Sequence, residues 1–169
     1  FAGFMDVGTV SKAFTIDSTA PATIAGVMTN NAPLIKGGAG VLVLSGPNQN
    51  TGGWTVTNGT LLVNGSAGSG EIVVTNTGIL GGTGTIAGAV TVESGGTLAP
   101  GASIGTLTIS SNLTLAGNAL FEVNKSVSPS NDVVVVAGTL TNAGTGTITV
   151  NNLGPALTVG DSFKLFSQA

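Results

Sequence analysis

The sequence has few charged residues and lacks several reactive side chains altogether. Four Lys and seven acidic residues make 7% of its 169 residues charged, against about 25% in a typical soluble domain. It contains no His, Cys, Arg or Tyr. Imidazole and thiolate groups are the usual general bases, thiol nucleophiles and zinc ligands. We therefore expect no zinc site held by His or Cys and no catalysis based on those side chains.

The charge balance and the short apolar runs argue against two kinds of partner. The net charge is −3 and the pI is about 4.4, so the chain lacks the basic stripe that binds a phosphate backbone. The longest strongly apolar run, residues 133–137, is far shorter than the ~18 residues that cross a bilayer. We expect no nucleic acid partner and no membrane span.

Glycine and small polar residues are abundant: 28 Gly, 24 Thr, 14 Ser and 14 Asn. They separate short runs of β-branched and aliphatic residues, and no run has the apolar spacing of three and four that predicts a helix. The fold class expected is therefore all-β. The clearest strands are predicted at residues 41–44, 54–57, 60–63, 72–75, 89–92, 106–109, 113–115, 120–123, 132–136 and 147–150.

A Gly-Thr-Leu/Ile triplet recurs along the chain and sets a period. Triplets begin at Gly59, Gly84, Gly96, Gly105, Gly138 and Gly146, with a related Gly-Ile-Leu at Gly78. The steps from Gly59 to Gly78, from Gly78 to Gly96 and from Gly84 to Gly105 are each about 20 residues long, a spacing typical of solenoids. The sequence thus predicts a right-handed parallel β-helix (β-solenoid) of about eight coils, a rod roughly 40 Å long.

In this β-helix, aliphatic side chains fill the interior, Thr, Asn and Ser face solvent, and Gly, Asn and Asp form the corners. The side chains expected to point inward are Leu61, Val63, Val73, Val90, Val92, Leu107, Ile109, Leu113 and Leu115. An antiparallel sandwich is the alternative, and Asn58-Gly59 is the one strong hairpin dipeptide between two predicted strands.

Residues 37–65 (GGAGVLVLSGPNQNTGGWTVTNGTLLVNG) resemble the passenger-associated transport repeat of bacterial autotransporters. The resemblance continues through residues 81–86 and 95–107, and residues 155–169 look like the segment that closes such repeats. It implies a right-handed β-helix stalk that is exported to the extracellular space or the bacterial cell surface, and it brings no catalytic residue. Trp54 departs from the pattern, where the repeat usually has Thr.

Two short motifs resemble enzyme signatures. Residues 101–105, centred on Ser103, match the G-x-S-x-G nucleophile elbow, but that motif needs a following helix and a His to take the serine proton. Residues 82–87 match a loose dinucleotide fingerprint, yet a predicted strand follows them instead of a helix. We interpret both as glycine-rich corners.

Glu71 and Glu93 lie one coil apart and are the acids considered for a glycan-cleaving site. Seven scattered acids and four Lys do not form the convergent cluster that such chemistry requires. Trp54 is the one large planar side chain that could stack on a sugar. It shares strand parity with the inward Val56, which favours core or corner packing.

Thr-x-Thr pairs suggest one more alternative, an ice-binding face. Their spacing is uneven, because pairs begin at Thr55, Thr75, Thr83, Thr106, Thr139 and Thr145. This spacing predicts no flat array in register, and Thr is a common solvent-facing strand residue.

We therefore expect a non-enzymatic extracellular structural protein, a self-associating rod or filament subunit, without catalytic residues, cofactor or metal. The alternative is the passenger stalk of an autotransporter-like adhesin. Residues 1–16 supply Phe1, Phe4, Met5 and Phe14 outside the repeat and are predicted to form an N-terminal arm or cap, with residues 17–169 as the β-helix. The expected partners are copies of the chain joined end to end through residues 1–16, with surface glycans as a further candidate.

Overall fold

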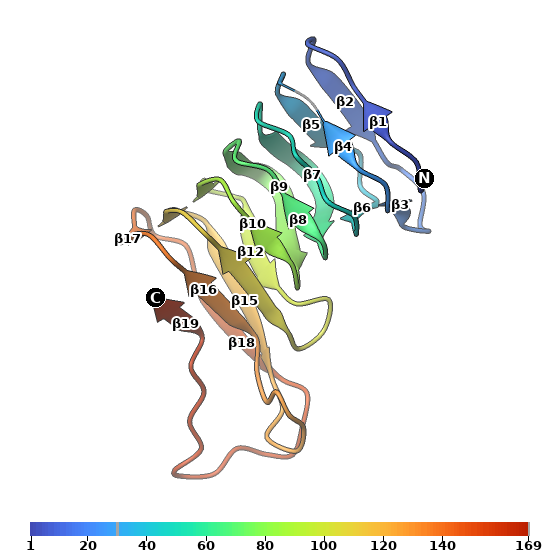
Figure 1. The fold of residues 1–169 in the computed structure, drawn as a ribbon. Coiled ribbons are helices and arrows are strands. Elements are labelled where there is room, and N and C mark those ends of the chain that lie inside the picture. The colour runs from blue at the N-terminus through green and yellow to red at the C-terminus, as the bar shows by residue number, and fades with distance from the viewer. Residues whose placement is uncertain (30, 169) are drawn as a thin grey trace.

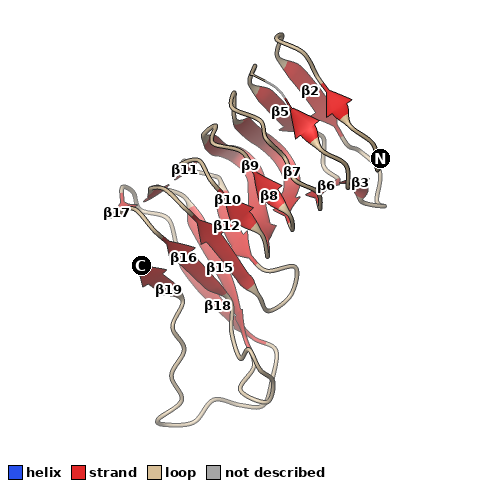
Figure 2. Ribbon diagram, in the orientation of Figure 1, coloured by secondary structure: helices blue, strands red, loops and turns tan. Residues whose placement is uncertain are grey.

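A computed structural model describes residues 1–29 and 31–168, and within them the chain forms 19 strands and no helix. The strands wind into successive turns of a β-solenoid, which run along the rod from the N-terminal to the C-terminal end (Figure 1). Figure 2 shows that loops and corners are the only other structure. Because no helix is present in this part of the chain, none is available to cross a membrane.

Each turn contributes one strand to each of three faces. Face A consists of β2 (Lys12–Thr15), β5 (Leu34–Gly37), the first half of β7 (Trp54–Val63), the first half of β9 (Ile72–Gly82), β11 (Val90–Val92), β14 (Leu113–Leu115) and β17 (Leu140–Asn142). Face B consists of β3 (Ala22–Ile24), β6 (Val41–Leu44), the second halves of β7 and β9, β12 (Thr97–Pro100), β15 (Asn118–Val123) and β18 (Ile148–Asn152). Face C consists of β1 (Met5–Asp6), β4 (Met28–Thr29), β8 (Ser66–Ala67), β10 (Thr85–Ile86), β13 (Thr106–Ile109), β16 (Val133–Val136) and β19 (Phe166–Gln168).

Every strand pairing on these faces is parallel, which confirms the solenoid and excludes the antiparallel sandwich. Asn58 and Gly59 form a bend inside β7, where the register against β9 shifts between Val56 and Asn58. The solenoid has fewer turns than the eight predicted, because the later turns are longer than the assumed period of about 20 residues.

The length of a turn changes along the rod. On face A, successive partners in the centre are Leu34, Trp54, Ile72 and Val90, so these turns have about 20 residues each. The later step on the same face, from Leu113 to Leu140, is clearly longer. The central turns thus confirm the predicted period, and the last turns carry extra loop residues outside the ladder.

The core is a set of aliphatic columns inside the three faces, with 0–7% of each side chain exposed. Eight of the nine side chains predicted to point inward are buried; these are Leu61, Val63, Val90, Val92, Leu107, Ile109, Leu113 and Leu115. Val73 is wrong, because Ile72 and Val74 on either side of it are the buried ones. Alternate residues of a strand face opposite sides, so Val73 points outward in register with Thr55 and Thr91.

Glycines at the corners allow neighbouring turns to approach closely. Gly59 has a φ of 63°, and a Cβ placed on it would collide with the backbone carbonyl of Gly38 in the preceding turn. Later corners meet backbone atoms in the same way, at Gly78, Gly96, Gly117 and Gly146. The abundant glycine therefore reflects contact between turns, in addition to freedom in φ.

One buried charge lies inside this framework. Lys36 is fully buried, and its Nζ donates to the carbonyl oxygens of Gly37, Gly38 and Asn58 at 2.8, 2.9 and 3.1 Å. Burial lowers the pKa of Lys36, and the charge of Asp17 partly offsets this shift. The ammonium group thus uses its three donors to join the corners of two turns.

The segment 1–16 forms the first turn of the solenoid. Strand β1 pairs with β4 and β2 pairs with β5, in parallel register. The carbonyl of Phe1 accepts hydrogen bonds from the amides of Ala25 and Gly26. Phe1 and Phe4 remain exposed at this end.

Candidate functional site

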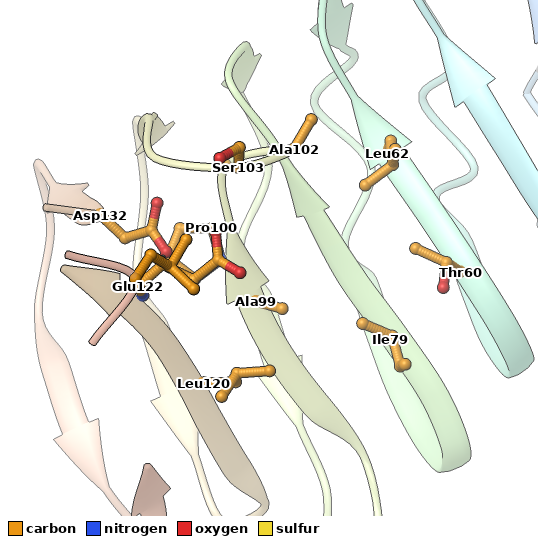
Figure 3. A pocket seen from close by; sticks show the side chains of 12 residues that line it. Thr60, Leu62, Ile79, Ala99, Pro100, Ala102, Ser103, Leu120, Glu122 and Asp132 are labelled. Carbon is orange, nitrogen blue, oxygen red and sulfur yellow. Dashed lines mark hydrogen bonds between the residues drawn. The ribbon is translucent and has the colours of Figure 1, made fainter. Parts of the chain in front are cut away.

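The outer surface of face B carries a groove of about 440 Å³. Figure 3 shows it from close by, with Leu62 and Ile79 toward one end and Glu122 and Asp132 toward the other. The groove crosses β7, β9, β12 and β15, which are three ladder steps apart, or about 14 Å. It is the main candidate site in the described part of the chain.

Strand parity explains why the groove floor is apolar. Leu61, Leu80, Leu98 and Phe121 point into the core, so the residues next to them in sequence face outward. These outward residues line the groove as Thr60, Leu62, Ile79, Ala99, Leu120 and Glu122. Aliphatic residues at outward positions distinguish face B from a surface of Thr and Asn.

Small residues make the floor concave. Leu62 pairs with Gly81, and Gly81 pairs with Ala99. Leu62 and Leu120 are the larger side chains on either side of these two. Because Gly81 and Ala99 project little or nothing, the middle of the stripe lies lower than its ends.

The loop between β12 and β13 forms one wall, through Gly101, Ala102 and Ser103. Its start is fixed by a two-way backbone bridge between Gly82 and Gly101, with both hydrogen bonds at 2.9 Å. Gly101 has a φ of 83°, a conformation that favours glycine. The loop predicted to be a corner is thus a defined wall.

Asp132 holds this wall against the floor. Its Oδ1 accepts a hydrogen bond from the Gly105 amide at 2.8 Å, and its Oδ2 accepts one from the Glu122 amide at 2.7 Å. Burial raises the pKa of Asp132, the two amide hydrogen bonds lower it, and the nearby Glu122 charge raises it further. Asp132 is therefore a buried carboxylate that joins three segments, next to a second carboxylate that faces the groove.

This arrangement does not supply the partners that a serine nucleophile requires. Ser103 is exposed on the wall, and a strand, β13, follows it, whereas the nucleophile elbow continues into a helix and needs a base. No group of three acids that could hold a metal occurs among residues 1–29 and 31–168. The groove therefore has the features of a binding surface: an apolar floor, two hydroxyls and an acidic end.

The other sequence candidates lie elsewhere. Glu71 precedes β9 and accepts a hydrogen bond from Thr91 Oγ1 at 2.7 Å. Glu93 follows β11 at the opposite end of face A. Since Ile72 pairs with Val90, the two acids are separated by about 13 Å along the strand direction. They do not form a carboxylate pair.

Trp54 is a core residue, as its parity indicates. Only 3% of its surface is exposed, and its ring lies 5.5 Å from that of Phe14. It is thus unable to stack on a ligand. Residues 82–87 lead from the end of β9 into the short strand β10, so no helix N-terminus is available there for a dinucleotide.

The threonines are more regular in space than in sequence. Thr55, Thr91, Thr114 and Thr141 share one outward column on face A. The sequence intervals missed this register because corners of different length separate the strands. The hydroxyl array is nevertheless interrupted, since the same column also contains Ala13, Ile35 and Val73.

Comparison with known families bears on the central turns. A family model described as the passenger-associated-transport-repeat matches residues 34–63, which confirms the resemblance noted at residues 37–65. The match begins at β5 and ends with β7, and so it spans slightly more than one turn. No curated protein matches the chain.

Proposed function

We propose that this chain is a non-enzymatic passenger β-helix, a stalk of an autotransporter-like protein at the bacterial cell surface. The observation that carries the proposal is the position of the repeat match. Residues 34–63 match a passenger repeat, and the same parallel ladder extends from that turn to β2 at one end and β17 at the other. A stalk needs a long, regular core, and this chain devotes its apolar residues to one.

The test is surface display. Residues 1–169 are placed between a secretion signal and the outer-membrane barrel of an autotransporter and are expressed in a bacterium. We expect an antibody to reach the rod on intact cells, and the rod to resist added protease. The matched control is Leu107→Asp, which breaks the core. A native chain that stays inside the cell, or that is degraded as fast as the control, would contradict the proposal.

End-to-end self-association is a second candidate, favoured by the last turn. Ile148 and Val150 occupy inward positions on β18, in register with Ala119 and Phe121, yet 51% and 46% of their surfaces are exposed. Strands with apolar edges of this kind are prone to pair with another chain. The partner surface would be the first turn, which includes residues 1–16.

Analytical ultracentrifugation over a range of concentrations tests this second candidate. We expect filaments or oligomers whose formation is weakened by Ile148→Asp, while the circular dichroism spectrum is unchanged. Thr91→Asp, an outward position on face A, is the control. A chain that stays monomeric at high concentration would leave the displayed stalk as the better description.

A further inference from the structure

We propose that the groove on face B binds a single-chain cationic amphiphile, with its apolar chain along the floor and its protonated amine at Glu122. The inference is independent of whether the rod serves as a stalk. It rests on the length of the groove, the distribution of its polar groups and the lack of a cation paired with its acidic end among the described residues.

The dimensions favour a narrow chain. The floor runs about 14 Å across three ladder steps, and the groove holds about 440 Å³, within the range of small-molecule sites. The contacts on offer are the outward side chains of Leu62, Ile79, Ala99 and Leu120. An alkyl chain laid along the axis of the solenoid would meet all four.

The polar groups lie at one end and have one sign. Glu122 and Asp132 lie together, away from Leu62 and Ile79 (Figure 3). The one ion pair in the described residues joins Lys125 to Asp161, so no described cation pairs with Glu122. A ligand cation would offset the repulsion between the two carboxylates that contributes to the raised pKa of Asp132. An anionic head group would add to that repulsion.

Asp132 is not the group that reaches the ligand. Both of its oxygens accept backbone hydrogen bonds and it is almost fully buried. Glu122 is half-buried on the outward side of β15, and only its backbone amide is used by Asp132. Glu122 can therefore be changed without removing the hydrogen bonds that hold the wall.

The experiment compares dodecylammonium, dodecanoate and dodecanol by isothermal titration calorimetry with the full chain, below the concentrations at which they aggregate. We expect dodecylammonium to bind with a stoichiometry of one and dodecanoate to bind at least about tenfold more weakly. Glu122→Gln should weaken dodecylammonium about tenfold, the loss expected for one charge-assisted contact, and should leave dodecanol unchanged. Glu93→Gln on face A is the charge control.

A second pair of variants tests the position of the chain. Ala99→Phe fills the middle of the groove from an outward position and should abolish binding of dodecylammonium and dodecanol. Thr114→Phe places the same ring on face A and should have no effect. Circular dichroism confirms that both variants are folded.

Three results would overturn the proposal. Equal affinity for dodecanoate and dodecylammonium would remove the role of Glu122. Binding that survives Ala99→Phe would place the ligand elsewhere. A groove that binds none of the three probes, but whose floor is protected by an extended apolar peptide, would indicate a protein partner instead.

Discussion

The central and the final turns follow the same strand order but differ in how well they bury their inward side chains. In the centre, turns of about 20 residues leave Leu61, Leu80 and Leu98 fully buried. In the last turn, the step on face B runs from Ala119 to Ile148 and is much longer, and Ile148 is half exposed. An inward position in a solenoid is therefore not enough for burial, which also requires a turn on each side and short corners.

The loops of the later turns lie mainly between faces B and C. Residues 124–132 connect β15 to β16, and residues 153–165 connect β18 to β19, the long excursions near the C-terminal end in Figure 1. These loops supply Asp132 and Leu153 to the groove. The regular turns thus carry the core, and the irregular ones add polar detail to its surface.

The largest expected difference between the two regions comes from a charge in the core. Leu107→Asp puts an unpaired carboxylate at a fully buried position and should lower the free energy of unfolding by about 4 kcal/mol or more. Ile148→Asp, at a half-exposed inward position, should cost about 1 kcal/mol. Urea unfolding followed by circular dichroism measures both. Equal losses would mean that the last turn is as well packed as the centre.

Corner glycines should show the next largest difference. Gly59→Ala combines a positive φ with a collision against the preceding turn and should cost about 2–4 kcal/mol. Gly160→Ala, in the last loop, also has a positive φ of 102° but open space around it, so about 1 kcal/mol is expected. Thermal melts compare the two variants. A similar loss in both would show that backbone conformation alone decides the cost, without the contact between turns.

Lysines provide a third comparison. Lys36→Met removes the donor to three carbonyl oxygens and should cost about 2 kcal/mol, whereas Lys125→Met, in an exposed ion pair, should cost about 0.5 kcal/mol or less. The lowered pKa of Lys36 makes the unfolded chain bind more protons between that value and the ordinary one. Unfolding free energy, measured by urea titration at several pH values, should therefore rise with pH across that alkaline window, and the Met variant should lose the rise. A rise that persists in Lys36→Met would assign it to another group.

The smallest expected effect is a difference in pH dependence between two aspartates. The raised pKa of Asp132 means that the folded chain binds more protons between the ordinary and the raised value, so its contribution to stability falls as pH increases through that window. The pKa of Asp161 is lowered, first by the Thr158 amide and then by Lys125, so its contribution is present above the ordinary value and lost as pH falls. Urea denaturation across the acidic range should show opposite changes in slope for Asp132→Asn and Asp161→Asn. Changes of the same sign would contradict this assignment.

The sequence was sufficient for the repeated parts of the fold. The predicted strands at residues 41–44, 72–75 and 106–109 all coincide with observed ones, because a regular period and a glycine at each corner are local signals. Trp54 was placed in the core by parity with Val56. Val73 was misplaced because a run of three aliphatic residues, Ile72 to Val74, does not reveal which parity faces inward.

The groove was missed because no local pattern encodes it. Its floor depends on which residues of different turns share a column, and corners of unequal length hide that register. Leu62 and Leu120 are far apart in the sequence, yet they lie on one stripe. The available signal was an aliphatic residue at outward parity, and reading it requires the core face to be known first. Asp132 gave no signal, since its role depends on Gly105 and Glu122 in other segments.

The stacking of glycine on backbone at the corners has a consequence for how such a rod can change in length. Each turn meets its neighbours through main-chain atoms and through aliphatic columns that are nearly interchangeable, so the junction between two central turns has little specific identity. Duplication or deletion of one turn would shift everything beyond it by about 4.8 Å and create no new kind of junction. Length in the central part is therefore a quantity that evolution or a designer can adjust in single steps, while the groove, which needs four particular turns in order, fixes the part that cannot be resized.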